Sequence, residues 1–176
     1  MNLPGGPTRD EILAIALSKI DVRPGDLFLD VGCGTGKVSV RAAPLARHVV
    51  ACDLRKEAVA FARKEAEEAG ARNIEFFCDN ATEIIPRIER PDCAFIGGSH
   101  DLAPVLSLLA ERNVRSVVVT AVKMDTMVNA ITLLKGLGMF REAVLVALSR
   151  ADPLGNNFIW RPEIPVAIVV GGWEEC

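Results

Sequence analysis

The chain of 176 residues has little of what metal, membrane and nucleic-acid proteins need. It contains only two histidines, and none of its five cysteines are spaced as a CxxC pair, so we expect no zinc site. Its longest apolar runs, such as residues 166–170, are far shorter than the ~20 residues that a membrane-spanning helix requires. There is no run of lysine or arginine, and the net charge is −3 at pH 7, which argues against a general nucleic-acid binder.

The sequence also lacks signs of export or of division into parts. The N-terminal residues have no basic-then-apolar signal pattern, and most cysteines lie in or beside apolar runs, as free thiols do in a reducing compartment. We therefore expect a cytoplasmic protein. No linker, internal repeat or low-complexity segment interrupts the chain, so we expect a single domain over residues 1–176 with a sizeable core.

Strand and helix patterns alternate along the chain. Five strand patterns are each followed by a helical pattern, and two last strands are joined only by a loop. This order predicts a doubly wound α/β fold, with a mostly parallel seven-stranded sheet and one antiparallel strand at its end. The expected strands are 27–31, 48–53, 73–79, 92–97, 116–122, 141–149 and 164–171.

Two helices carry specific expectations. Residues 8–11 have the form of a capping box, with Thr8 as the N-cap of a helix that reaches Ile20. We expect further helices at about 36–47, 55–69 and 101–112. In the last helix, an apolar stripe is expected to be core, and it comprises Met124, Met127, Val128, Ile131 and Leu134.

Residues 30–36, DVGCGTG, form a glycine loop directly after the first strand. A Walker loop would need glycine at position 31 and serine or threonine at position 38, and both positions are valine. In the dinucleotide pattern G-x-G-x-x-G the third small residue would fall at Lys37, where it would obstruct helix–strand packing. The pattern that fits is D-x-G-x-G-x-G, typical of doubly wound methyltransferases that use S-adenosylmethionine. Its glycines let the backbone approach the amino-acid part of the ligand, and the following helix N-terminus favours the carboxylate.

Two other strand ends are in register with this loop. Asp53 ends the second strand, 17 residues beyond Gly36, where an acid can accept hydrogen bonds from both ribose hydroxyls. Asp79, Asn80 and Ala81 end the third strand and should flank the adenine. The sequence therefore predicts a cofactor site that also includes the loop residues Gly32, Cys33, Gly34, Thr35 and Gly36.

Six stretches extend the pattern beyond the loop. They are PGGPTRDEI (4–12), LDVGCGTG (29–36), FIGGS (95–99), TAVKMDT (120–126), SRADPLG (149–155) and IPVAIVVGG (164–172). With them the chain resembles the precorrin and cobalt-precorrin carbon-15 methyltransferases (decarboxylating) of cobalamin biosynthesis along almost its whole length. It departs from that family's pattern at His100-Asp101, at Asn80 and at residues 156–158.

The resemblance implies an activity and a second set of site residues. The activity is methyl transfer from S-adenosylmethionine to a ring carbon of a tetrapyrrole, with loss of CO2 from an acetate side chain, and the resemblance implies a homotetramer. Thr8 joins the cofactor site, and the strand-end loops at 97–100, 120–125 and 150–158 face the substrate. The implied substrate residues are Gly98, Ser99, Lys123 and Arg150, and the candidates for clamping its carboxylates are Arg9, Lys123, Arg150 and Arg161.

Other functions stay open at this point. One is another small methyltransferase acting on RNA, protein or a metabolite, although the N-P-P-[YF] signature of many amino-group methylases is missing after the fourth strand. Another is a cofactor-binding module of the same fold without catalysis. A nucleotide-dependent oxidoreductase is disfavoured by Lys37. No catalytic side chain is predicted, because a ring carbon would be the nucleophile, and the sequence does not say whether the ring already carries cobalt.

Overall fold

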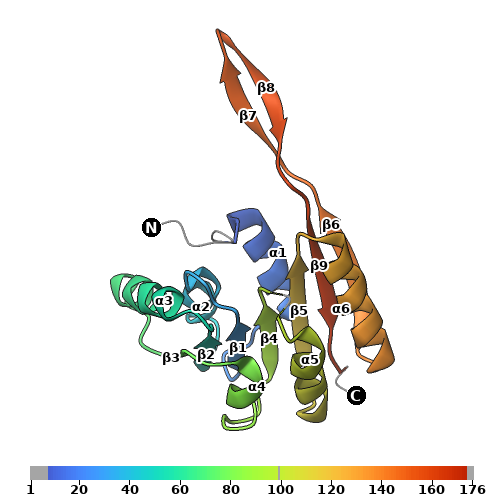
Figure 1. The fold of residues 1–176 in the computed structure, drawn as a ribbon. Coiled ribbons are helices and arrows are strands. Elements are labelled where there is room, and N and C mark those ends of the chain that lie inside the picture. Colours follow the sequence, from blue (N-terminus) through green and yellow to red (C-terminus); the bar gives the residue numbers. More distant parts are fainter. Residues whose placement is uncertain (1–7, 99, 174–176) are drawn as a thin grey trace.

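The computed structural model describes residues 8–98 and 100–173, so the predicted substrate residue Ser99 lies outside the described residues. A seven-stranded sheet runs through the centre, in the order β3-β2-β1-β4-β5-β9-β6, with helices on both faces (Figure 1). Its strands are β1 (Leu27–Val31), β2 (His48–Cys52), β3 (Ile74–Phe77), β4 (Cys93–Ile96), β5 (Ser116–Ala121), β6 (Phe140–Val146) and β9 (Val166–Gly171). The predicted doubly wound fold is confirmed.

Strand direction also follows the prediction. β1 to β5 are mutually parallel, and β9 is antiparallel to both of its neighbours, β5 and β6. The one antiparallel strand lies second from the edge, with β6 outside it, and not at the end of the sheet as expected. The predicted strands differ from the observed ones by up to three residues at their ends.

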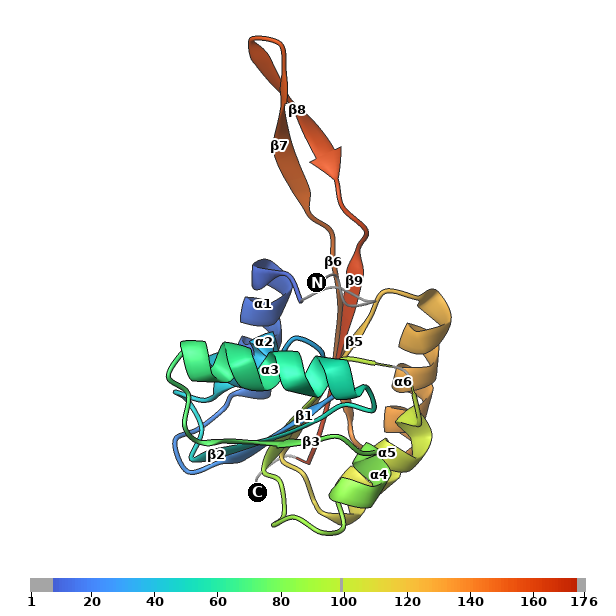
Figure 2. The same ribbon diagram turned by 60° about the vertical axis from the view of Figure 1, so that its left-hand side comes forward.

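The helices cover the sheet in two layers (Figure 2). One layer holds α1, α2 and α3, and the other holds α4, α5 and α6. Both faces of the central strands are therefore buried, which is why these strands read as continuous apolar runs. The helices are α1 (Asp10–Ile20), α2 (Lys37–Ala42), α3 (Lys56–Glu68), α4 (Ala81–Ile84), α5 (Leu102–Glu111) and α6 (Met124–Gly136).

The segment expected as a loop between the last two strands is instead a β-hairpin. β7 (Ser149–Leu154) pairs with β8 (Asn157–Pro162) through a two-residue turn, in which Gly155 has φ +59°. Glycine reaches such a conformation without strain, and two-residue turns are the commonest hairpin connections. We call this hairpin the arm, because it extends from β6 and β9 well beyond the rest of the molecule (Figure 1).

Three local predictions are wrong. Thr8 is not the helix cap, because α1 begins at Asp10 with Arg9 as N-cap, and the Arg9 side chain bonds to Glu163 and Ile164 instead. The second helix, expected over 36–47, ends at Ala42. The apolar stripe of α6 is only partly core: Leu134 is buried and Met127 and Ile131 pack against the core, but Met124 and Val128 are exposed.

Candidate active site

The carboxyl ends of four neighbouring strands meet at one edge of the sheet. The register aligns Val31 at the end of β1 with Cys52 of β2 and Ile96 of β4, and Ile96 with Val119 of β5. Chain order reverses between β1 and β4, and open α/β sheets bind ligands at such a switch point. The glycine loop follows β1 at this position.

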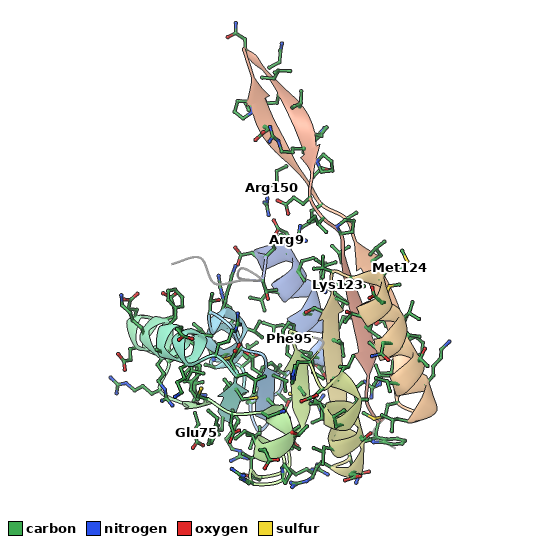
Figure 3. The ribbon with its side chains drawn as sticks, viewed as in Figure 1. Arg9, Glu75, Phe95, Lys123, Met124 and Arg150 are labelled. Atoms are coloured by element: carbon green, nitrogen blue, oxygen red, sulfur yellow. The ribbon has the colours of Figure 1, made fainter. Side chains whose placement is uncertain are left out.

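A cavity of about 1000 Å³ opens at this edge. Its volume is at the upper end of the roughly 300–1,000 Å³ typical of ligand pockets. It reaches from the glycine loop to the base of the arm, and Figure 3 shows Arg9, Lys123 and Arg150 at this end of the molecule. Its walls include the glycine loop and strand-end residues with Thr8, Arg9, Ile12, Arg55, Phe95, Gly98, Thr120, Lys123, Thr126, Glu163, Ile164 and Val166.

The glycine loop needs its glycines for backbone conformation and for packing. Gly32, Gly34 and Gly36 have φ of 74°, 53° and 77°, which other residues adopt only with strain. A Cβ on Gly36 would also lie 2.7 Å from the Cβ of Ala62, so this glycine lets the loop contact α3. The backbone N–H groups of Gly32 and Cys33 donate to the Cys52 carbonyl at 2.9 and 3.0 Å, which fixes the loop to β2.

Asp53 holds the loop from the end of β2. Its nearly buried carboxylate accepts the Gly34 N–H at 3.0 Å, the Arg55 N–H at 3.0 Å, and the Arg55 Nε and Nη2 hydrogens, both at 2.9 Å. Burial alone would raise the pKa of Asp53, but the hydrogen bonds from Arg55 and Gly34 outweigh it and hold the pKa below its ordinary value. The carboxylate is therefore charged and ordered before any ligand binds.

Asp30, the first residue of the glycine motif, lies fully buried behind the loop. Its Oδ2 accepts a hydrogen bond of 2.5 Å from the Ser39 hydroxyl, while Oδ1 has no partner among the described residues. Burial raises the pKa of Asp30 to about 7, although the Ser39 hydrogen bonds act in the opposite direction. Asp30 therefore supports the loop from within and does not line the cavity.

The structure separates the predicted cofactor residues into two groups. Those on the cavity wall are Thr8, Gly32, Cys33, Gly34 and Thr35, with Gly36 buried beneath the loop and Asp53 one hydrogen bond behind Gly34. The third-strand residues Asp79, Asn80 and Ala81 do not line this cavity.

Local bonds account for the third-strand group. Asn80 caps α4 by accepting the Thr82 N–H at 3.1 Å, and its amide donates to Asp101 at 2.6 Å. Asp79 lines a smaller cavity of about 440 Å³, and Ala81 is buried. The adenine-flanking role of these residues stays a prediction.

The predicted substrate residues also differ in their surroundings. Gly98 and Lys123 line the cavity, and Lys123 has no acidic partner among residues 8–98 and 100–173. Arg150 lies at the base of the arm and is paired with Glu11 and Glu163. Arg161 pairs with Asp152 across the arm at 2.6 Å.

Sequence reasoning missed Glu163 and Arg55. Glu163 lines the cavity beside Arg9, but it follows the arm, which had been expected to be a loop. Arg55 lines part of the cavity, and Asp53, two residues before it, holds its guanidinium there. Among the described residues no cluster of histidine, cysteine and acids could hold a metal ion, and no helix is long and apolar enough to span a bilayer.

Strand order, glycine loop and the acid at the end of β2 together define the doubly wound, class I methyltransferase fold. Similar solved structures bear this out. One is the precorrin 8W decarboxylase of Methanobacterium thermoautotrophicum, with a TM-score of 0.91 and 26% identity over 98% of this chain and 96% of that one. Another is the precorrin-6Y C5,15-methyltransferase of Geobacter metallireducens, also with a TM-score of 0.91, at 25% identity over 98% and 94%.

The comparisons also assign the chain to one family among those that share this fold. The family model described as precorrin methyltransferase domain matches residues 4–171, and the chain belongs to this family. Relatives from Methanosarcina mazei and Methanosarcina acetivorans are each 41% identical over 97% of this chain and 96% of their own length. Both are described as probable cobalt-precorrin-6B C(15)-methyltransferases (decarboxylating). The chain is thus a C-methyltransferase, as its sequence had indicated.

Proposed function

We propose that this enzyme transfers a methyl group from S-adenosylmethionine to carbon 15 of cobalt-precorrin-6B and releases CO2 from an acetate side chain. The observation that carries the proposal is the continuity of the cavity, which joins the glycine loop to Lys123 and to the base of the arm. A cofactor at the loop and a large second ligand beside it would therefore be in contact. The family and the names of the 41% identical relatives support the same reaction.

The residues at the glycine loop fit S-adenosylmethionine. Gly32 is exposed on the cavity wall, so the wall there is bare backbone that a ligand can approach closely. The charged Asp53 can accept hydrogen bonds from a pair of ribose hydroxyls if they replace its two bonds from the Arg55 guanidinium, and Thr8 and Thr35 add polar groups beside the loop. When bound, this cofactor supplies a methyl group activated by its attachment to a sulfonium.

The remaining walls suit a large, flat ligand with several carboxylates. Ile12, Phe95, Ile164 and Val166 provide apolar surface, and Lys123 provides a positive charge. The nucleophile is a ring carbon, so the protein's main task is to fix distance and angle, which can be worth ~7–11 kcal/mol. The conjugated ring accepts the electrons from the departing carboxylate, and apolar walls around that carboxylate assist by excluding water.

We further propose that the enzyme works in the cytoplasm as a homotetramer, with no nucleic-acid or membrane partner. The arm supports self-association because four of its large apolar side chains are exposed: Leu154, Phe158, Ile159 and Trp160. An isolated two-stranded hairpin is only marginally stable in water, so a second copy that covers the arm would stabilise it. The buried thiols of Cys33, Cys52 and Cys93 suit a reducing compartment.

The test is a reaction with methyl-labelled S-adenosylmethionine and cobalt-precorrin-6B, followed by mass spectrometry of the tetrapyrrole. One product should have gained a labelled methyl group and lost one CO2. Methyl gain without CO2 loss would refute the decarboxylating reaction. Cofactor binding without methyl transfer would refute catalysis and leave a binding module. A parallel reaction with the metal-free ring determines whether cobalt is required.

A further inference from the structure

Two guanidinium groups converge on one carboxylate at the cavity wall. Glu163 follows β8, Arg9 precedes α1, and Arg150 lies in β7, and the bonds of Glu163 to both arginines bring these three segments together. Figure 3 shows Arg9 and Arg150 near each other at the base of the arm. Arg9 bonds to Glu163 Oε2, and the Nε of Arg150 donates to Oε1 at 2.5 Å. Each carboxylate oxygen therefore has its own arginine. Glu163 and Arg9 both line the cavity, and their side chains are 24% and 25% exposed.

Each arginine has a second anchor that does not depend on Glu163. The Nη2 of Arg9 donates to the Ile164 carbonyl at 2.5 Å. The Nη1 and Nη2 of Arg150 approach the two carboxylate oxygens of Glu11 at 3.0 and 3.1 Å. If the Glu163 side chain moved away, both guanidinium groups would stay in place. The pair would then form a preorganised site for another carboxylate, the group that arginine binds with the most favourable geometry.

We propose that Glu163 is an internal placeholder, which occupies a carboxylate-binding site formed by Arg9 and Arg150 until a carboxylate of the substrate displaces it. This inference rests on the proposed function, because it requires a substrate with several carboxylates. The exchange leaves the number of ion pairs at the arginines unchanged, so a small anion gains little by it. A ligand that also fills the cavity and contacts Lys123 has additional binding energy to drive the exchange.

A structural role for Glu163 predicts the opposite behaviour. If this residue only ties the arm to α1, its loss should loosen the base of the arm and weaken the binding of any ligand there. If it is a placeholder, its loss removes a competitor, so substrate-like ligands should bind more tightly. Substitution of Glu163 therefore separates the two roles by the sign of the effect.

The experiment uses uroporphyrin, a stable macrocycle with eight carboxylates, titrated against the full-length protein and followed by fluorescence. Glu163→Gln should bind it about five- to tenfold more tightly than the wild type. Glu163→Asp, which keeps the charge but shortens the reach to the two arginines, should show a smaller gain. The matched control is Glu11→Gln, which removes the same charge from Arg150 but leaves Glu163 in place, and it should show no gain.

Every outcome of these titrations either supports or contradicts the placeholder role of Glu163. Equal gains in Glu163→Gln and Glu11→Gln would mean that only net charge matters, and would overturn the inference. So would weaker binding by Glu163→Gln and Glu163→Asp when circular dichroism shows both folded. If the wild type turns over cobalt-precorrin-6B but Glu163→Gln shows no gain in affinity for uroporphyrin, the placeholder role is refuted and the proposed function stands. If no variant binds the macrocycle and the wild type transfers no methyl group, the proposed function fails with it.

Discussion

The carboxylate of Asp53 provides the sharpest test of the cofactor site. Asp53→Ala should weaken binding of S-adenosylmethionine by ~1.5–3 kcal/mol, the range for hydrogen bonds to a charged group, which is about 10- to 150-fold in Kd. The matched variant Asp53→Asn keeps the shape and one acceptor oxygen, so it can still hold the Gly34 N–H and should lose less.

The structure adds a constraint that concerns Arg55. An ionised carboxylate has about four acceptor positions, and four N–H groups already occupy those of Asp53. Two of the four belong to the Arg55 guanidinium, so ribose hydroxyls can bind only by replacing these two bonds. Arg55→Ala removes the competing group and should leave cofactor affinity unchanged or raise it.

Isothermal titration calorimetry measures both effects, with thermal unfolding as the check that each variant is folded. Undiminished affinity in Asp53→Ala would refute the ribose role. The pH dependence of protein stability gives a second readout, because the pKa of Asp53 is held below its ordinary value. Its contribution to stability is present above the unfolded-state pKa of ~3.9 and is lost as pH falls through the lower folded-state value. Asp53→Asn should therefore reduce the loss of stability in acid, while cofactor affinity between pH 6 and 8 should not change through this group.

Three other predictions concern the loop, its buried acid and the arm. Gly36→Ala should lower the free energy of unfolding by ~2–4 kcal/mol through its positive φ and its clash with α3, whereas Gly25→Ala, with open space around it, should change little in the same denaturant titration. Because burial raises the pKa of Asp30 to about 7, the folded state retains a proton that the unfolded chain releases, so stability should fall as pH rises from about 4 to 7. Melting temperatures of Asp30→Asn should lack this fall. The double variant Phe158→Ser/Trp160→Ser should have a lower mass by light scattering than the wild type, and an unchanged mass would exclude the arm as the contact between copies.

The sheet could be predicted from the sequence because its central strands are buried on both faces. A strand such as β1, buried along its whole length, is apolar apart from Asp30 and is therefore recognisable, and the glycine loop after it is set by local backbone geometry. The arm could not be recognised in the same way. Its strands are exposed and contain Pro153 and Pro162, which disfavour strands, and only the Gly155-Asn156 pair signalled a two-residue turn.

Helical periodicity shows which residues share a face but not how much of that face is covered. The stripe on α6 is correctly placed on one side, and Leu134 near its end is fully buried against the sheet. Met124 and Val128 are exposed, although Met127 between them packs against the core. Burial depends on how neighbouring elements are placed around the helix, which the pattern within one helix does not contain.

The ion-pair partners of the charged residues in the site also could not be predicted from the sequence, and these partners matter for function. A sequence shows Arg9 and Arg150 as cations near substrate-facing loops, but their partner Glu163 is 154 residues from one and 13 from the other. Only the folded chain shows that both are already neutralised. Binding of a polyanion by this protein of net charge −3 must therefore exchange ion pairs at the arginines, whereas Lys123 can form one without breaking an ion pair to any described residue. Affinity then depends on how well the rest of the ligand fits the cavity, because the ligand's ion pairs with the two arginines only replace those that Glu163 made.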